Sequence, residues 1–303
     1  MCENGRLVIP LRNRYICSMK KMVFALQCVL LVSGKCEKKP VVELPPPDKT
    51  NPEVQGGDPA PDKGSLRLAT YNVGVFSKSG TNTTGMVAAM VRELGVSALS
   101  MNELDSCNTR HNVFQIKLFA EAMGGWDYTF AQALDYKGGG YGIGIASDPS
   151  LQLQKRFRLK LDRGDGSEQR ALAVCEFRDF VFCSTHLDHK SKTAQLAQAV
   201  AITDWVKSKY GNTDKPVILC GDFNALPTSE TISYMKREWT ILSPFDFTYP
   251  AEKPIKCIDY IMVYKNASSR VELLGAEVPV AFKSGDVKIA SDHLPVYVDV
   301  KIK

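Results

Sequence analysis

Residue types that build metal clusters and disulfide frameworks are scarce or poorly placed in this sequence. The 303 residues include four histidines and nine cysteines, and no two cysteines have the Cys-x-x-Cys spacing of a zinc site. Four of the nine cysteines lie within the first 36 residues, while Cys183 and Cys220 stand in apolar, strand-like runs. Cysteines in such runs behave as small buried hydrophobic residues. The sequence therefore argues against a zinc-ribbon or disulfide-rich protein.

The apolar stretch near the N-terminus is too short for a membrane-spanning helix. This stretch, VFALQCVLLV at 23–32, contains ten residues, whereas a spanning helix needs about 20. Lys20 and Lys21 precede it, which is the arrangement of a signal peptide. We therefore expect residues 1–35 to be a leader for export, with translation beginning at Met19.

Two routes for the processing of this leader stay open. Cleavage after Gly34 would place small residues at the recognised positions and release a secreted protein. Lipidation of Cys36 would instead give an outer-membrane lipoprotein of the cell envelope. A bacterial lipobox has Leu and a small residue where this chain has Ser33 and Lys35, so the pattern does not decide between the two routes.

Residues 36–64 have neither a helical nor a strand period. They contain seven prolines, which indicates a semi-rigid spacer that would reach up to ~85 Å at ~3.1 Å per residue. The segment is either a spacer between a membrane anchor and a catalytic domain or a tail without a role.

Net charge is also absent once the leader is set aside. The chain has 38 basic and 33 acidic residues, but six basic residues and one acidic residue precede Cys36. The remainder carries 32 residues of each sign. A neutral surface does not favour binding to a polyanion such as nucleic acid, although a local basic patch stays open.

Beyond residue 65, short apolar runs alternate with helical patterns. The spacing predicts strands at 66–73 and 96–104, helices at 83–94 and 112–124, and a long helix near 190–208. A strand-rich middle and three later strands bring the total to about ten strands and four helices. We therefore predict one α/β domain over 65–303, with two sheets packed face to face and helices outside.

The ends of the predicted strands carry an unusual set of polar residues. Each of them alone is ordinary as a turn former, a cap or a solvated end. Six strand ends in one domain that all present an acid, an amide or an imidazole indicate a shared site. These residues are Asn72, Glu103, His186, Asp188, Asp222, Asn224, Asp259, Asp292 and His293.

The motifs around these residues resemble one known superfamily. In chain order they are TYNV, NELD, STHLDH, GDFN, IDYI and SDHLPV, from about Leu66 to Val300. This ordered set is similar to the endonuclease/exonuclease/phosphatase superfamily, which includes deoxyribonucleases, sphingomyelinases and inositol polyphosphate 5-phosphatases. The resemblance implies a four-layer αββα sandwich, in agreement with the separate count of strands and helices.

Hydrolysis of a phosphoester needs a water nucleophile and neutralisation of charge on the phosphoryl oxygens. Glu103, with Asn72 beside it, offers hard oxygen ligands for Mg²⁺, or for Mn²⁺ in its place. The resemblance implies that Asp292 is a further metal ligand or an acid that hydrogen-bonds to the ligands from behind. Asp222 would orient or deprotonate the attacking water, and Asn224 would donate to a phosphoryl oxygen.

The imidazoles complete the predicted catalytic group. His293 would face the scissile phosphate, with Asp259 as the carboxylate that orients its ring and favours its cationic form. His186 would donate to a phosphoryl oxygen or to the leaving group. The number of metal ions does not follow from these residues.

Three further residues match positions near the cleft in one bacterial branch of the superfamily. Tyr141, Arg170 and Asp188 are therefore predicted substrate contacts, although Tyr141 would equally fit the core and Arg170 a solvated strand. That branch has an arginine on the helix after Asp188, and here Gln195 stands in its place. A phosphate contact from that helix is accordingly in doubt.

The sequence predicts a monomeric, exported, Mg²⁺-dependent phosphoester hydrolase. Its expected substrate is a phosphorylated small molecule or a lipid headgroup, and lipidated Cys36 would add a membrane contact. A secreted nuclease is the alternative within the same chemistry, and a non-catalytic envelope binding protein is the alternative from another class. A pure binding protein would not need both the acids and the imidazoles.

Overall fold

A computed structural model of the protein describes residues 64–303. The expected leader, its processing at Gly34 or Cys36, and the spacer up to residue 63 lie outside the described residues. Within 64–303, no helix has the length and apolar character that crossing a membrane would require.

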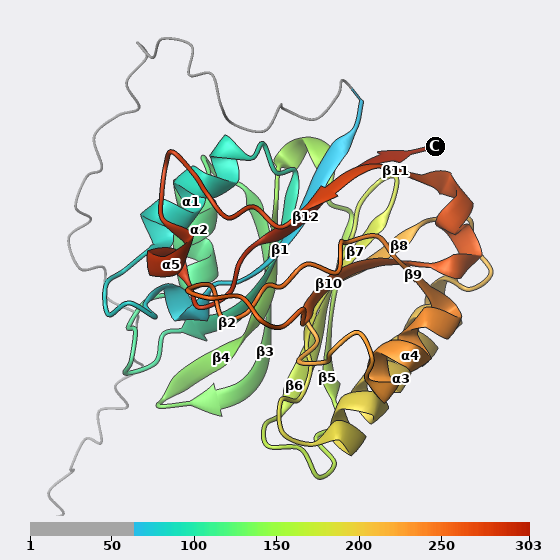
Figure 1. The fold of residues 1–303 in the computed structure, drawn as a ribbon, viewed down its shortest axis with the longest axis horizontal. Coiled ribbons are helices and arrows are strands. Elements are labelled where there is room, and N and C mark those ends of the chain that lie inside the picture. The colour runs from blue at the N-terminus through green and yellow to red at the C-terminus, as the bar shows by residue number, and fades with distance from the viewer. Residues whose placement is uncertain (1–63) are drawn as a thin grey trace, which may run out of the picture. The chain divides into compact units, whose positions relative to one another are not determined.

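Two mixed six-stranded sheets form the framework of residues 64–303 (Figure 1). The first sheet has the strand order β11 (Val271–Glu277), β12 (Val296–Ile302), β1 (Leu66–Asn72), β2 (Ala98–Ser106), β4 (Gly139–Ser147) and β3 (Asp127–Tyr136). The second has the order β5 (Lys155–Leu161), β6 (Arg170–Glu176), β7 (Val181–His186), β8 (Val217–Asp222), β10 (Asp259–Tyr264) and β9 (Trp239–Ile241).

Helices cover the outer face of each sheet. Figure 1 shows α1 (Thr84–Glu93), α2 (Gln115–Ala122) and the short α5 (Val287–Ala290) on the first sheet. It shows α3 (Lys192–Tyr210) and α4 (Glu230–Glu238) on the second. Three short 3₁₀ helices connect the elements: η1 (Gly74–Phe76), η2 (Pro149–Leu151) and η3 (Lys265–Arg270). The predicted four-layer αββα sandwich is confirmed.

The alternation of side chains along β6 explains how the layers pack. Ala171, Ala173 and Cys175 join the cluster that includes the first sheet, while Leu172 and Val174 join the cluster under α3 and α4. Side chains two residues apart on a strand point to the same face. The face of β6 toward the first sheet therefore carries small residues, and the face toward the helices carries larger ones.

The strand directions bring the predicted polar residues to one edge of the two sheets. β1 and β2 are parallel with Asn72 opposite Asn102, and β7 and β8 are parallel with His186 opposite Asp222. β10 is antiparallel to β8, so its first residue, Asp259, lies opposite the last residue of β8, Asp222. Three carboxyl-terminal strand ends and one amino-terminal end thus meet beside the middle of β2. The prediction that Glu103 ends its strand is wrong, because β2 continues to Ser106.

The sequence prediction missed several peripheral elements. In residues 64–303 the structure has twelve strands and five α-helices, against about ten and four predicted. β9 has three residues, α5 has four, and β11 is an edge strand on which Leu273 and Leu274 are each 45 % exposed. Such short or half-exposed elements lack the alternation by which strands are recognised.

Candidate active site

The amide of Asn72 links the polar groups at the end of β1. Its Nδ2 lies 3.2 Å from Oε1 of Glu103 and 3.1 Å from Oδ2 of Asp222, and 3.4 Å from Nε2 of His293. Its Oδ1 accepts a hydrogen bond of 3.1 Å from the backbone N–H of Gly74. Asn72 is fully buried. In this orientation it positions both acids, and the prediction that it also ligates a metal would require its amide to turn.

A β-bulge places Glu103. The register between β2 and β4 shifts between Met101 and Leu104, and Glu103 has a φ of 58°. Bulges of this kind redirect a side chain, and here the pairing with β4 continues beyond the bulge to Ser106. The residue before it, Asn102, has its Nδ2 2.8 Å from the carbonyl oxygen of Thr185, and its Oδ1 accepts from the backbone N–H of Asp222 at 2.9 Å. Asn102, which was not predicted, therefore joins the two sheets directly beneath the site.

Asp222 lies between two imidazoles. Its Oδ2 is 3.4 Å from Nε2 of His186 and 3.6 Å from Nε2 of His293, and its Oδ1 accepts from the backbone N–H of Asn224 at 2.8 Å. Burial, reinforced by the nearby charge of Asp259, raises the pKa of Asp222 to about 7. A carboxylate with such a pKa can exchange a proton near neutral pH.

The two imidazoles have opposite electrostatic environments. Burial lowers the pKa of His293, but Asp259 and Asp222 outweigh it and raise that pKa to about 10. Nδ1 of His293 lies 2.9 Å from Oδ2 of Asp259, which also accepts from Thr248 Oγ1 at 2.6 Å. For His186, burial and the charge of Arg170 lower the pKa well below its ordinary value. His293 is therefore a cation at neutral pH, and His186 is neutral.

The residues fit a divalent cation at Glu103 and Asp292. Nζ of Lys78 lies 3.4 Å from Oε2 of Glu103 and 3.1 Å from Oδ2 of Asp292, so these two carboxylates already hold a positive charge between them. Both side chains are partly exposed at the cleft, at 19 % and 34 %. Partly solvated carboxylate oxygens suit Mg²⁺, which keeps several of its waters.

A second group that could hold a metal consists of Asp222, Asp259 and His293, whose donor atoms lie within 4.8 Å of one another. All three residues are buried. The 2.9 Å contact between His293 and Asp259 is an ion pair, just as Lys78 pairs with Glu103 and Asp292. Exposure distinguishes the two groups, because Mg²⁺ keeps several of its waters and the partly exposed Glu103–Asp292 pair leaves more room for them than the fully buried group does.

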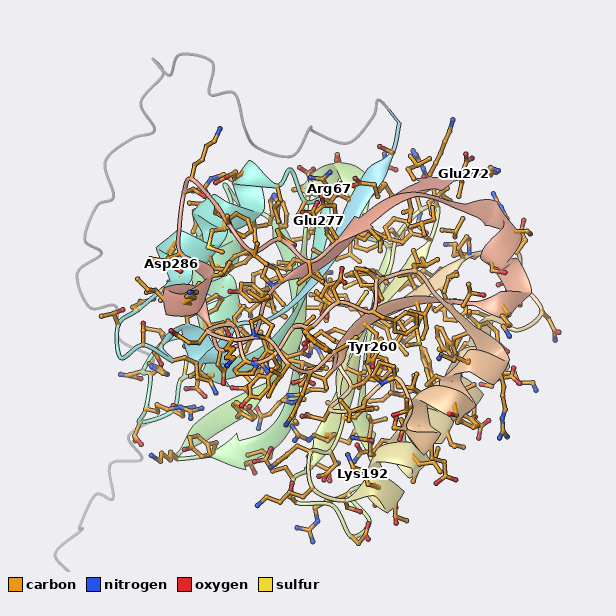
Figure 2. All side chains as sticks on the ribbon, viewed as in Figure 1. Arg67, Lys192, Tyr260, Glu272, Glu277 and Asp286 are labelled. Carbon is orange, nitrogen blue, oxygen red and sulfur yellow. The ribbon has the colours of Figure 1, made fainter. Side chains whose placement is uncertain are left out.

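These groups open into a cleft of about 470 Å³. Tyr141, Arg170, His186, Asp222, Asn224 and His293 all line it, as do Glu103, Lys78 and Asp292. Arg170 is 2 % exposed, and its guanidinium contacts Glu168 at 3.3 Å and Nδ1 of His189 at 3.0 Å. Lys192, labelled in Figure 2 at the start of α3, also lines the cleft.

The structure brings all predicted site residues except Asp188 to the cleft or directly behind it. Asn72 and Asp259 stand behind the lining residues through the contacts described above. The carboxylate of Asp188 instead accepts from the backbone N–H groups of Ser167, Lys190 and Ser191. Burial opposes its charge, but these hydrogen bonds lower its pKa to about 2. Its contact with substrate stays a prediction, and its observed contacts hold the loop before α3.

Gln195 explains how the loop after β8 is held. Its Nε2 donates to the carbonyl oxygens of Asp188 and Asn224, at 2.9 Å and 2.8 Å. Asn224 has a φ of 50°, and its Nδ2 lies 3.2 Å from the carbonyl oxygen of Leu187. The hydroxyl of Tyr260 (Figure 2) donates to the carbonyl oxygen of Ala225 at 2.7 Å. The GDFN segment is therefore fixed by three neighbouring elements.

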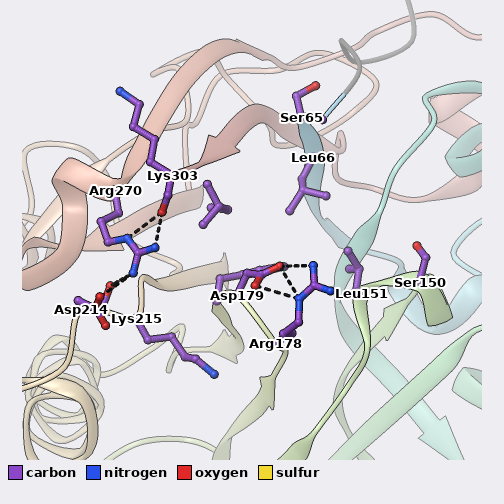
Figure 3. A pocket seen from close by; sticks show the side chains of 13 residues that line it. Ser65, Leu66, Ser150, Leu151, Arg178, Asp179, Asp214, Lys215, Arg270 and Lys303 are labelled. Carbon is purple, nitrogen blue, oxygen red and sulfur yellow. Dashed lines mark hydrogen bonds and ion pairs between the residues drawn. The ribbon is translucent and has the colours of Figure 1, made fainter.

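A larger hollow, of about 620 Å³, lies at the opposite end of β1 (Figure 3). Its lining includes Leu66, the first residue of β1, whereas the cleft lies at Asn72, the last. Within this hollow Arg178 pairs with Asp179 and Arg270 with Asp214, both at 2.8 Å. Because both side-chain carboxylates that line the hollow are held in these ion pairs and no imidazole lines it, we assign no chemistry to it.

One family of known proteins matches most of this chain. The family model for the Endonuclease/Exonuclease/phosphatase family matches residues 69–293, a span that contains all the predicted site residues. No curated protein matches the chain significantly.

Solved structures share the fold at low sequence identity. An endonuclease/exonuclease/phosphatase of Bacteroides vulgatus is 18 % identical with a TM-score of 0.67, covering 80 % of this chain and 100 % of its own. A mannosyl-6-phosphatase of Bacteroides thetaiotaomicron is 21 % identical with a TM-score of 0.64, covering 78 % and 99 %. The human Nocturnin catalytic domain is 17 % identical with a TM-score of 0.60, covering 79 % and 94 %.

Proposed function

Since the chain belongs to the endonuclease/exonuclease/phosphatase family, we propose that it is a divalent-metal-dependent hydrolase of small phosphoesters, with Mg²⁺ as the ion. The observation that carries this proposal is the placement of Asp222. Its Oδ2 is within 3.6 Å of two imidazoles, and it shares the amide nitrogen of Asn72 with Glu103. Acid, base and cation site are thereby connected in one cleft.

The residues divide the work of hydrolysis. Asp222 accepts a proton from the attacking water as the new bond from oxygen to phosphorus forms and the bond to the leaving oxygen breaks. Cationic His293, held by Asp259, offers its Nε2–H to the charge that develops on the phosphoryl group. Neutral His186 and the amide of Asn224 add hydrogen bonds to the same group. A cation at Glu103 and Asp292, when bound, would neutralise negative charge on the phosphate.

The cleft favours a small substrate over a nucleic acid duplex. Its lining contains four Lys or Arg residues and cationic His293 against four acidic residues, so it has only a small net charge to attract a polyanion. Its volume of about 470 Å³ lies in the usual range for small-molecule sites. Arg170 and Lys192 are placed to bind an anionic or hydroxyl-rich group of the substrate.

An exposed apolar side chain, Leu226, lines the cleft and is 46 % exposed. Phe245, Phe247 and Ile255 are 49 %, 54 % and 58 % exposed, and they lie close in the sequence to Tyr249 and Lys256, which line the cleft. A free phosphorylated molecule and the headgroup of a lipid present the same phosphoester chemistry. These exposed apolar residues make the lipid-linked form a necessary arm of the substrate test.

Turnover assays test the proposal. Hydrolysis would be measured with Mg²⁺ and with EDTA, each substrate by its own product. Nitrophenyl phosphate and sugar and inositol phosphates release phosphate, bis-nitrophenyl phosphate releases nitrophenol, sphingomyelin vesicles release phosphocholine, and plasmid DNA becomes nicked. We expect Mg²⁺-dependent turnover of small esters that is lost in Asp222→Ala and His293→Ala, both folded by circular dichroism. Asp179→Ala, in the hollow of Figure 3, should retain it. Activity that survives EDTA, or faster cleavage of plasmid DNA than of every small ester, would contradict the proposal.

We also propose that the enzyme acts in the cell envelope or outside the cell, on the support of the leader pattern in residues 1–35. Fractionation of cells that express the full chain and its Cys36→Ser variant tests this. Membrane association that Cys36→Ser abolishes indicates a lipid anchor, and release of both forms into the medium indicates free secretion. Retention of both forms in the cytoplasm would refute export.

A further inference from the structure

Lys78 occupies the place between Glu103 and Asp292, and nothing in the hydrolytic scheme uses it. The three residues come from different parts of the fold: the segment after η1, the bulge in β2 and the loop between α5 and β12. Oε1 of Glu103 is taken by Asn72, and the other oxygen, Oε2, faces the ammonium of Lys78. Oδ2 of Asp292 faces the same ammonium at 3.1 Å.

The backbone before Lys78 is shaped to bring its side chain there. Gly74, Val75 and Phe76 have φ values of 53°, 52° and 51°, so three successive residues adopt the left-handed region. This conformation is rare and costly for a β-branched residue such as Val75. Phe76 is buried, with its ring 6.0 Å from that of Phe119, and this packing holds the turn.

Gly74 provides the path for the lysine stem. A Cβ on Gly74 would lie 2.2 Å from Cγ and 2.7 Å from Cε of Lys78, so any other residue would displace the side chain. The turn and the missing Cβ are two separate features that both direct the ammonium to the carboxylates.

We propose that Lys78 is a built-in occupant of the cation site and sets the affinity for the divalent metal by competing with it. This inference rests on the metal dependence proposed above. The ammonium contacts Oε2 of Glu103 and Oδ2 of Asp292 at 3.4 Å and 3.1 Å. A Mg²⁺ ion bound to these oxygens at about 2.0–2.1 Å would lie against the ammonium, and because both are positively charged they exclude each other. Lys78 is 37 % exposed and can swing toward solvent when the ion enters. Without the ion, the ammonium keeps the two carboxylates from repelling each other.

Calorimetric Mg²⁺ titration of Lys78→Met tests the competition. Losing two partly exposed ion pairs with the ammonium should lower the Kd for Mg²⁺ roughly three- to tenfold. Saturating Mg²⁺ should also raise the thermal midpoint of Lys78→Met more than that of the unaltered protein. The matched control is Lys256→Met, which removes the same charge from another side of the cleft, where the ammonium lies over the ring of Tyr249. Its Kd should change less than about twofold.

Gly74→Ala provides a second, independent variant because it keeps the charge of Lys78 but displaces its stem. It should also tighten Mg²⁺ binding, as measured by the same titration. An unchanged or weaker affinity in Lys78→Met would overturn the inference while leaving the proposed hydrolase intact, provided that EDTA still abolishes turnover. Absence of Mg²⁺ binding in every form, together with turnover that resists EDTA, would overturn the inference and the metal dependence together.

Discussion

Asp222→Asn should make the protein more stable and at the same time inactive. The side chain is 2 % exposed, and burial with the charge of Asp259 raises its pKa from 3.8 to about 7. The folded state therefore binds this proton more tightly than the unfolded chain does. The stabilisation of the folded state by the proton on Asp222 is complete below pH 3.8 and is lost as the pH rises toward 7.

The size of the effect follows from the shift. A change of about three pKa units corresponds to ~4 kcal/mol at ~1.4 kcal/mol per unit, which is a ceiling for the cost of ionising Asp222. An asparagine cannot ionise, and its oxygen can still accept from the backbone N–H of Asn224. The difference in unfolding free energy between variant and unaltered protein should therefore grow by ~2–4 kcal/mol from pH 4 to pH 7 and then level off. The lost bond from Asn72 adds an offset that does not depend on pH.

Urea unfolding in EDTA at pH 5, 6, 7 and 8 measures this difference, and turnover with Mg²⁺ measures the catalytic loss. We expect turnover to fall by about 10²–10⁴, as for removal of a general base. Asp179→Asn is the control, because a hydrogen bond from Arg178 lowers the pKa of Asp179 and it stays ionised throughout this range. If the difference in unfolding free energy between Asp222→Asn and the unaltered protein stays constant between pH 5 and pH 8, the reasoning is refuted.

Three further variants examine the surrounding groups. In Asp259→Asn, burial should prevail over the remaining charge of Asp222, so the pKa of His293 should fall from about 10. The basic limb of the pH profile of kcat/KM should then move to lower pH, and an unmoved limb would count against the ion pair. Asn102→Ala removes two buried hydrogen bonds between the sheets and should lower the unfolding free energy, measured in urea, by ~2–4 kcal/mol. A loss below ~1 kcal/mol would show that these hydrogen bonds between the sheets are dispensable. Arg170→Met should raise KM for the best small ester more than it lowers kcat. The reverse pattern would show that Arg170 stabilises the transition state more than it binds the substrate.

The convergence of the site could be predicted from strand ends alone, because strand direction carries the information. Asn72 and Asn102 share a register position on parallel strands, as do His186 and Asp222. Once TYNV, STHLDH and GDFN are each placed at the carboxyl end of a strand, neighbouring strands bring their polar residues together. NELD joins them from a bulge within β2, which the strand-end reasoning did not predict. Asp188 shows where this reasoning fails, since a carboxylate just beyond a strand can serve backbone N–H groups instead of the cleft.

Lys78 could not be predicted because local preferences point the other way. The sequence GVF at 74–76 gives no sign of a left-handed turn, since valine and phenylalanine avoid positive φ. Tertiary contacts override this preference, namely the packing of Phe76 against Phe119 and the hydrogen bond of 2.6 Å from Nε2 of Gln115 to the carbonyl oxygen of Val75. A lysine in a segment between a strand and a helix is ordinarily solvated, so its type and position carried no signal of the two carboxylates beside it.

Positive φ angles gather at the cleft, and this explains why the rest of the site resists prediction from the sequence. Of the seven non-glycine residues with positive φ in 64–303, Glu103 and Asn224 line the cleft, and Val75 and Phe76 form the turn that leads to Lys78. Each such residue costs of order 1–3 kcal/mol unless the surrounding structure over-determines it. The compensation comes from contacts distant in sequence, such as Gln195 on the carbonyl of Asn224. Local sequence can therefore identify which residues take part, whereas their orientation is decided by neighbours that local patterns do not contain.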